Sequence, residues 1–316
     1  MNGISIVGTG SYIPKHCIDN TELSKYVDTS DEWIRTRTGI RKRHFCGEGE
    51  NTRTMAIEAA KEIISNATKN KKINKDEIGV VVVATSTANE LFPSTACMVS
   101  KALELSQEVM AFDISAACSG FLYGIQIVKS LLECSEKKYA LLIGSEQISR
   151  IVDFKDRSTC VLFGDGASGI LISLNENYYL HKSWSLGNYQ GLSCKGAGYE
   201  DQYLKMDGKQ VFKFAVKSFE NAIHQLVEES GIHQSDIDLI IPHQANERII
   251  ECVKKKFKDL SDRFYVNIGE YANTSAASIP IAINELFEKK KLKNGMTIMC
   301  VSFGAGFTWS GVLMEI

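Results

Sequence analysis

Short apolar runs rich in valine and isoleucine recur along the whole chain, and longer stretches with a helical pattern lie between them. Continuous apolar runs of this kind are typical of strands that are buried on both faces of a sheet. The longer stretches bring apolar residues to one face at the helical period, so we expect helices that pack against those sheets. This alternation predicts a layered α/β fold. The expected strands are Ile4–Val7, Val80–Val83, Tyr139–Ile143, Gly169–Ile172, Leu239–Ile241 and Met296–Val301, and the expected helices include Thr54–Ile64, Phe121–Leu132 and Val211–Glu229.

The order of short motifs in the first half of the chain returns in the second half. In each half an acidic turn leads into an apolar strand, and a Phe-Gly segment later leads into another. The matching segments are Asp76–Val83 with Asp236–Ile241, Phe163–Leu171 with Phe303–Leu313, and, more loosely, Phe112–Ala117 with Val266–Ala277. A shared order of this kind predicts a duplicated α/β unit, with one half at residues 1–175 and the other at residues 176–316.

Composition and charge exclude several classes of function. The chain has 316 residues, of which 44% are hydrophobic and 23% are charged, and its net charge is −2. Such a chain lacks the strong positive charge that is typical of nucleic-acid-binding proteins. No apolar run reaches the ~18 residues of a membrane-spanning helix, and Met1–Ile13 lacks the pattern of a secretion signal. We therefore expect neither a nucleic acid nor a membrane as a partner.

Cysteine and histidine usage indicates the compartment and argues against a metal site. The nine cysteines include no Cys-x-x-Cys pair. In a chain of this length, that is typical of reduced thiols in a cytoplasmic protein. The six histidines show no metal-ligand spacing to one another or to a cysteine, so we expect no metal.

Cys118 is the first candidate for a chemical role. It follows the apolar segment Phe112–Ile114 and stands among small residues just before the helical stretch Phe121–Leu132. A strand, a tight turn and a helix would place its sulfur near a helix N-terminus, where free N–H groups favour the thiolate nucleophile. A small buried hydrophobe is the ordinary alternative, and we interpret Cys97, Cys134, Cys160, Cys252 and Cys300 in that way.

Three more segments carry groups suited to ligand binding. His243 follows the apolar strand Leu239–Ile241, and the ends of such strands are where open α/β folds bind ligands. Asn273 precedes a run of small residues, and the Gly304–Gly306 loop leaves its backbone N–H groups accessible. Each has a structural alternative, namely a hydrogen-bonded histidine at a strand end, a helix N-cap and an ordinary turn.

Taken together, these segments resemble the β-ketoacyl-[acyl-carrier-protein] synthase III family, the condensing enzymes that initiate bacterial type II fatty-acid synthesis. The likeness covers nearly the whole chain. It rests on Ile6–Ser11, Asp28–Ile34, Thr36–Ile40, Asp113–Gly120, Phe163–Gly166, Pro242–Asn246, Asn273–Ala277 and Phe307–Trp309. The resemblance implies a thiolase-like five-layered αβαβα fold, a homodimer and no cofactor, with acetyl-CoA or another short acyl-CoA and malonyl-acyl carrier protein as substrates.

The resemblance also assigns the chemistry. Cys118 would attack the acyl-CoA thioester and carry the acyl group. His243 and Asn273 would donate hydrogen bonds to the malonyl thioester oxygen as carbon dioxide leaves. The backbone N–H groups of Cys118 and Ala305 would form the oxyanion hole. Ala305 occupies a loop that is richer in glycine in relatives, and its side chain limits the backbone angles.

Binding residues follow from the same family match. The expected CoA site consists of Trp33, Arg37, Thr38, Arg157 and Asn246, with Trp33 and Arg157 on the two faces of the adenine and Ser158 in place of a frequent glycine. The expected carrier-protein patch consists of Lys213, Arg248, Lys255 and Lys256, for which a solvated helix surface is the alternative. Phe92 would cross the dimer interface and close the partner's acyl pocket.

Other enzymes of the same superfamily remain alternatives. A specialised-metabolism ketosynthase III would load a branched or aromatic acyl group onto the same three residues. A non-catalytic ketosynthase-like subunit would have lost the nucleophile, whereas Cys118 is present. A thiolase would need a second cysteine near Gly304–Gly306, and elongating ketosynthases use two histidines where this chain has His243 and Asn273.

Overall fold

A computed structural model describes residues 3–70, 73–196 and 199–316 of the chain. Its first main sheet has the strand order β1-β7-β6-β4-β5. β1 is antiparallel to β7 and β7 is antiparallel to β6, whereas β6, β4 and β5 run parallel to one another. The strands are β1 (Gly3–Tyr12), β4 (Ile78–Ala84), β5 (Met110–Ile114), β6 (Tyr139–Glu146) and β7 (Gly166–Asn175).

The second main sheet repeats this arrangement. Its order is β11-β12-β13-β8, with β11 parallel to β12 and the other neighbours antiparallel. Its strands are β8 (Tyr179–Asn188), β11 (Leu239–Pro242), β12 (Thr297–Gly304) and β13 (Gly306–Glu315). In the direction β8-β13-β12-β11 the sheet has the same order and strand directions as β1-β7-β6-β4. β5 also has a reduced counterpart, because Phe264 forms a parallel bridge with Ile240.

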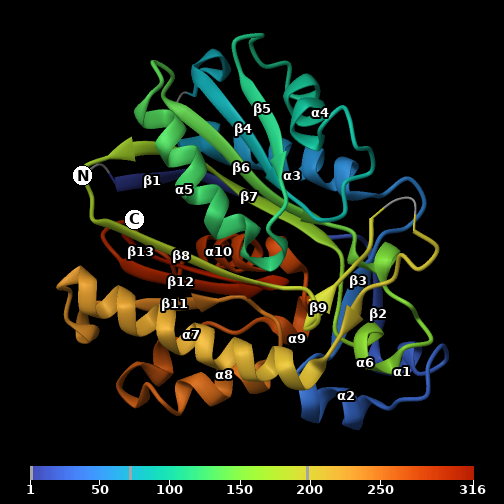
Figure 1. The fold of residues 1–316 in the computed structure, drawn as a ribbon. Helices are drawn as coiled ribbons and strands as arrows, with labels where there is room; N and C mark the ends of the chain where they lie inside the picture. The colour runs from blue at the N-terminus through green and yellow to red at the C-terminus, as the bar shows by residue number, and fades with distance from the viewer. Residues whose placement is uncertain (1–2, 71–72, 197–198) are drawn as a thin grey trace.

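Helices separate and cover the two sheets, which gives five layers (Figure 1). α3 (Thr52–Asn70) and α4 (Thr95–Ala102) pack on the outer face of the first sheet. α5 (Gly120–Glu133) and α10 (Ser278–Glu288) lie between the sheets and contact both. α7 (Gly208–Ser230) covers the outer face of the second sheet, and α8 (Glu247–Lys254) packs against α7. The expected thiolase-like αβαβα architecture is confirmed.

Burial explains why the sequence pattern located these layers. One apolar cluster joins α5 and α10 to both sheets, and two further clusters fill the spaces beneath α3 and α7. α5 and α10 are therefore apolar over most of their circumference, whereas α7 has one apolar stripe formed by Ala215, Phe219, Ala222, Ile223 and Leu226. Each expected strand and helix lies inside an observed element of the same type, except that β12 begins at Thr297, one residue after the expected start at Met296.

Smaller elements form a lobe beside the second sheet and complete the chain. A fourth apolar cluster holds this lobe together, and Trp33 packs against it. The remaining elements are β2 (His16–Asp19), α1 (Asn20–Leu23), α2 (Asp31–Thr38), β3 (Lys42–Phe45), η1 (Lys75–Glu77), η2 (Ala117–Ser119), η3 (Ile148–Ile151), α6 (Arg157–Cys160), β9 (Leu192–Ser193), β10 (Lys205–Met206), η4 (Gln234–Asp236), η5 (Lys258–Arg263), α9 (Ile268–Tyr271) and η6 (Ser275–Ala277), where η marks a 3₁₀ turn. Within the described ranges, no helix is both long and apolar enough to cross a membrane.

Candidate active site

Cys118 lies in the 3₁₀ turn η2, directly before α5, as the small-residue motif predicts. Ala117 before it has a φ of +46°, a left-handed conformation that reverses the chain between β5 and α5. The sulfur is thereby turned into the molecule, and Cys118 is 8% exposed. The sequence thus correctly predicted that Cys118 lies in a turn between a strand and a helix.

Burial favours the neutral form of the Cys118 thiol, whereas the sequence predicted a thiolate. It raises the pKa of Cys118 to about 12, because little solvent is available to stabilise a thiolate. The Ser275 hydroxyl, 3.4 Å from Sγ, opposes the shift only in part. The N-terminus of α5 therefore does not hold Cys118 as a thiolate at rest. The helix was visible in the sequence, but the degree of burial depends on the whole fold.

His243 follows β11, and its imidazole is fixed by one hydrogen bond. Its backbone N–H donates to the Val301 carbonyl on β12, which continues the sheet by one residue. Nδ1 lies 2.6 Å from the hydroxyl of Ser278 at the start of α10. Nε2 is buried and has no hydrogen-bond partner among the described residues. Burial lowers the pKa of His243 to about 3, so the ring is neutral.

Asn273 is 6% exposed and precedes η6. Its side-chain Oδ1 accepts the backbone N–H of Ser275 at 2.8 Å, which is a turn of the type asparagine favours. Its backbone bridges Phe163 on the loop before β7. With Oδ1 occupied, the Asn273 amide group is oriented to offer its N–H donors to a ligand.

The short segment Asn273–Ser278 connects all three candidate residues. It carries Asn273 itself, the Ser275 hydroxyl that accepts from Cys118, and the Ser278 hydroxyl beside His243. Glycine allows this segment to lie directly on β6, because a Cβ at Gly144 would stand 2.4 Å from the Ala276 carbonyl oxygen. The candidate residues thus come together on this segment, with Cys118 from the first half of the chain and the other two residues from the second.

The loop after β12 leaves space in front of the Cys118 backbone. A Cβ at Gly304 would lie 2.9 Å from the Cys118 nitrogen and 3.0 Å from the Ser119 nitrogen. A side chain at position 304 would therefore cover the Cys118 N–H, one of the two donors expected in an oxyanion hole. Ala305 is half-buried and does not have a positive φ, so its methyl group is accommodated without strain.

Trp33 contacts two guanidinium groups in the small lobe. The Cζ atoms of Arg37 and Arg157 are 4.5 and 4.9 Å from the Trp33 ring centroid. Arg157 also donates to the Asp28 carbonyl at 3.0 Å. The structure therefore brings these three expected CoA-site residues together. The space between Trp33 and Arg157 is too narrow for a base, because two contacts of about 3.5 Å each would be required.

The other two expected CoA-site residues, Thr38 and Asn246, differ in burial and in their hydrogen bonds. Thr38 is 3% exposed, and its hydroxyl donates to the Ile34 carbonyl and accepts from the Ile40 N–H. This hydroxyl stabilises the end of α2, and the contact of Thr38 with CoA stays a prediction. Asn246 is half-buried and caps α8 by accepting from the Arg248 N–H.

Ser158, at the position where relatives often carry glycine, acts within its own turn. Its hydroxyl and its backbone N–H both bond to Asp156, at 2.6 and 2.9 Å. Asp156 is the N-cap of α6, the short helix that carries Arg157. Ser158 thereby fixes the start of the turn that presents the Arg157 guanidinium to Trp33.

The expected carrier-protein patch lies on α7 and α8. Lys213, Arg248, Lys255 and Lys256 are exposed. The Arg248 guanidinium stands 5.8 Å from the ring of Phe212 on α7, the helix that also carries Lys213. Lys256 forms a 2.5 Å ion pair with Glu220. α8 also contacts α2, so this basic surface adjoins the helix that carries Trp33.

Three residues of the site had no assignment from the sequence. Ser275 and Ser278 lie in and beside a recognised motif, and only the fold shows what their hydroxyls contact. Glu146 ends β6, is fully buried and accepts a hydrogen bond from Ser275 at 3.1 Å. A charged residue three positions after the apolar run Tyr139–Ile143 is a signal that could have drawn attention to it.

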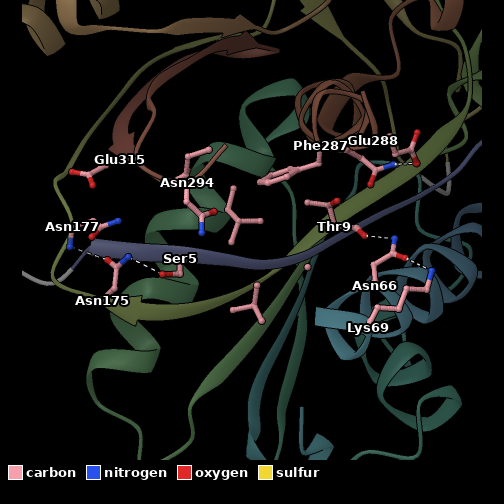
Figure 2. Close-up of a pocket in the computed structure, with 16 residues that line it drawn as sticks. Ser5, Thr9, Asn66, Lys69, Asn175, Asn177, Phe287, Glu288, Asn294 and Glu315 are labelled. Carbon is pink, nitrogen blue, oxygen red and sulfur yellow. Dashed lines mark hydrogen bonds between the residues drawn. The ribbon is translucent and has the colours of Figure 1, made fainter. Parts of the chain in front are cut away.

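A separate cavity of about 850 Å³ opens at the β1 edge of the first sheet, and its described lining includes none of Cys118, His243 and Asn273. Figure 2 shows that polar side chains around it bond mainly to one another. Asn175 donates to Ser5, and Asn66 donates to the Thr9 carbonyl. The cavity is therefore distinct from the site around Cys118. No group of three metal-binding side chains occurs among the described residues.

Comparisons with known proteins identify the family. Residues 112–185 match the family described as 3-oxoacyl-[acyl-carrier-protein (ACP)] synthase III, and residues 227–316 match its C-terminal region. A β-ketoacyl-[acyl-carrier-protein] synthase III of Clostridium botulinum (strain 657 / Type Ba4) is 45% identical, over 99% of this chain and 98% of its own. The chain belongs to the β-ketoacyl-[acyl-carrier-protein] synthase III family. The family expected from the sequence motifs is thereby confirmed.

Solved structures of the family superpose closely. The 3-oxoacyl-[acyl-carrier-protein] synthase III of Aquifex aeolicus VF5 has a TM-score of 0.93 at 41% identity, covering 99% of this chain and 100% of its own. The Pseudomonas aeruginosa PAO1 enzyme has a TM-score of 0.91 at 35% identity, covering 99% and 98%. The protein is accordingly an acyltransferase of the condensing-enzyme class that initiates fatty-acid synthesis.

Proposed function

We propose that the protein joins an acetyl or another short acyl group from CoA to malonyl-acyl carrier protein, with Cys118, His243 and Asn273 as the reacting residues. The observation that carries the proposal is the convergence of these residues on the segment Asn273–Ser278. The products are a 3-oxoacyl-acyl carrier protein, CoA and carbon dioxide.

In the first half-reaction Cys118 attacks the acyl-CoA thioester. The sulfur forms a bond to the acyl carbon and CoA leaves as the thiolate. The developing oxyanion occupies the space left by Gly304, where the backbone N–H groups of Cys118 and Ala305 donate to it. Trp33, Arg37, Arg157 and Asn246 hold the CoA portion at the rim.

In the second half-reaction the malonyl thioester oxygen accepts hydrogen bonds from His243 Nε2 and the Asn273 amide. These neutral donors stabilise the enolate that forms as carbon dioxide leaves, each by ~3 kcal/mol. The enolate carbon attacks the acyl-Cys118 carbonyl, and the tetrahedral intermediate expels the Cys118 thiolate. The low pKa of His243 keeps its donor unchanged throughout, because a neutral ring donates without adding charge.

Two surfaces fit the expected macromolecular partners. Lys213, Arg248, Lys255 and Lys256 would steer an acidic carrier protein toward the site. A second copy of the chain would cover the β5 edge of the first sheet, where Met110 is 53% exposed and the nearby Leu91 and Phe92 are 88% and 84% exposed. The cytoplasmic location stays a prediction.

Acyl loading and condensation can be measured separately, which tests the proposal. Peptide mass mapping after brief incubation with acetyl-CoA should find one acetyl group, on Cys118. Asn273→Ala should accept acetyl as the wild type does, yet condense about 10²–10³-fold more slowly with malonyl-acyl carrier protein. Acetyl on another cysteine, or an equal loss in both half-reactions, would contradict the assigned roles.

A further inference from the structure

Cys118 needs a proton acceptor, because the buried thiol is neutral at rest. The nucleophile must lose its proton before or during attack on the acyl-CoA thioester. His243 has no role in that step in the proposal, and its Nδ1 already faces Ser278. The acceptor is therefore expected among the other polar groups in contact with the sulfur.

The sulfur is the first member of a hydrogen-bonded chain that ends on a carboxylate. Cys118 Sγ–H donates to Ser275 Oγ at 3.4 Å, and Ser275 O–H donates to Glu146 Oε1 at 3.1 Å. Both donors point in the same direction, from the thiol toward the carboxylate. Ser275 has a φ of +51°, so the turn holds it in a left-handed conformation between the two groups.

Glu146 accepts hydrogen bonds from neutral groups, and no ion pair with Glu146 occurs among the described residues. Its two oxygens accept from the Thr87 hydroxyl at 2.6 Å, the Thr85 hydroxyl at 3.3 Å and the Ser86 N–H at 3.1–3.2 Å. Neutral donors alone stabilise the charge, and burial raises the pKa of Glu146 to about 7. The group thus exchanges a proton readily near neutral pH.

Charged groups on the surrounding segments have other partners. Arg150 donates to the carbonyls of Thr87 and Ala88, and Arg53 pairs with Glu90. Asp165 accepts from the Ser149 hydroxyl and the Cys46 N–H. Among the described residues, Cys118 is therefore the titratable group that the hydrogen-bonded chain connects to Glu146.

We propose that Glu146 stores the Cys118 proton through Ser275 during each catalytic cycle. As Sγ bonds to the acyl carbon, its proton passes to Ser275 Oγ while the Ser275 proton passes to Glu146. CoA leaves as the thiolate and takes a proton from solvent. When condensation later expels the Cys118 thiolate, the Glu146 proton returns through Ser275. One external proton is consumed per cycle, which balances the loss of the malonyl carboxylate as carbon dioxide.

This inference rests on Cys118 being the nucleophile, and the pH dependence of its reactivity tests the two ideas separately. Wild-type acetylation by acetyl-CoA should rise with pH through an inflection near 7 and then level off, because ionised Glu146 accepts the proton. Alkylation of Cys118 by iodoacetamide should show the same inflection without any acyl-CoA.

Two variants interrupt the relay at different points. Glu146→Gln and Ser275→Ala should both acetylate about 100-fold more slowly at pH 7, within the range of general-base catalysis. Both should lose the inflection near 7, and the rate should keep rising with pH as the thiol itself ionises. The matched control is Ser145→Ala, since the Ser145 hydroxyl is equally buried on β6 but donates to the Thr52 carbonyl.

The outcomes are distinguishable. An unlabelled wild-type Cys118 would overturn the proposed function. A labelled Cys118 whose pH inflection persists in either variant would overturn the relay alone, as would an equal slowing by Ser145→Ala. If Glu146→Gln does not fold, Ser275→Ala decides by the same criterion.

Discussion

His243 Nδ1 and Ser278 Oγ lie 2.6 Å apart, and this contact determines which imidazole nitrogen carries the proton. The Gln244 N–H donates to Ser278 Oγ at 3.4 Å, and we assign the Ser278 hydroxyl as the donor to Nδ1. A neutral ring that accepts at Nδ1 carries its hydrogen on Nε2. That nitrogen is buried without a partner, which is the arrangement required for a donor that awaits a substrate oxygen.

Removing the Ser278 hydroxyl should therefore impair condensation selectively. In Ser278→Ala the two neutral tautomers become similar in energy, so we expect condensation about 10-fold slower, as for a lost hydrogen bond near 1.4 kcal/mol. Acetylation of Cys118 should stay within about two-fold of the wild type. Ser278→Thr restores the hydroxyl and should recover most of the rate. Equal slowing of both half-reactions in Ser278→Ala would instead indicate a packing defect in α10.

Closure of Arg157 on Trp33 predicts an opening step in CoA binding. The guanidinium must withdraw from the ring before adenine enters, and it can then stack on the opposite face of the base. Arg157→Ala should raise the KM for acetyl-CoA about 5- to 30-fold with kcat nearly unchanged, which corresponds to 1–2 kcal/mol of cation–π contact.

Arg35→Ala is the control for Arg157→Ala. Arg35 is exposed on α2, the helix that carries Trp33, and it pairs with Asp31. Steady-state kinetics with varied acetyl-CoA would distinguish the two variants. A similar KM increase in Arg35→Ala would show that loss of positive charge, and not the loss of stacking, causes the effect.

The sequence predicted the layers and the elements that carry Cys118, His243 and Asn273, because both leave local signals. Buried strands leave continuous apolar runs, and Cys118, His243 and Asn273 stand in recognisable motifs. The hydrogen bonds that control these residues join positions far apart, such as Ser275 and Glu146, which are separated by 129 positions. No local pattern specifies such a pairing. It follows from Gly144, which allows η6 to lie on β6.

Two expectations about cysteines were wrong for related reasons. The helix N-terminus at Cys118 predicted a thiolate, but desolvation by both halves of the fold outweighs the helix and raises the pKa. Cys97 and Cys134 were expected to be small buried hydrophobes, but both are exposed. In each case the surroundings of the cysteine depended on contacts that the sequence does not display.

Charge reversal of Arg248 should weaken the use of malonyl-acyl carrier protein. Arg248 is exposed and contacts Phe212 on α7, so Arg248→Glu places a negative charge where an acidic partner would dock. We expect kcat/KM for this substrate to fall about 10-fold or more at low salt and the difference to shrink as salt screens the charges. Acetylation of Cys118 by acetyl-CoA should change little.

Lys291→Glu is the matched control for Arg248→Glu, since Lys291 is exposed beyond the end of α10 and the charge change is identical. It should leave use of the carrier protein unchanged. A comparable loss in Lys291→Glu would attribute the effect to net charge rather than to the surface on α7 and α8.

Phe92 is expected to limit the length of the acyl primer. Phe92 is 84% exposed in the single chain, beside Leu91 at 88%, and a second copy of the chain would cover both in the proposed homodimer. A phenyl ring that reaches the partner's acyl pocket occupies the space of additional methylenes, each of which would gain about 0.8 kcal/mol if it fitted. Phe92→Thr should therefore shift kcat/KM from acetyl and propionyl toward longer acyl-CoAs, with a rise of several-fold for each methylene accommodated.

Leu91→Thr separates this role from interface packing. Leu91 adjoins Phe92 and is equally exposed, so its truncation removes a similar apolar contact between copies. If Phe92 closes the pocket, only Phe92→Thr should change the order of preference among acyl-CoAs from two to about eight carbons, measured with dimer content matched by light scattering. If the ring merely packs the interface, both variants should lower dimer content and keep the wild-type order. An unchanged order in a fully dimeric Phe92→Thr enzyme would exclude Phe92 as the residue that sets primer length.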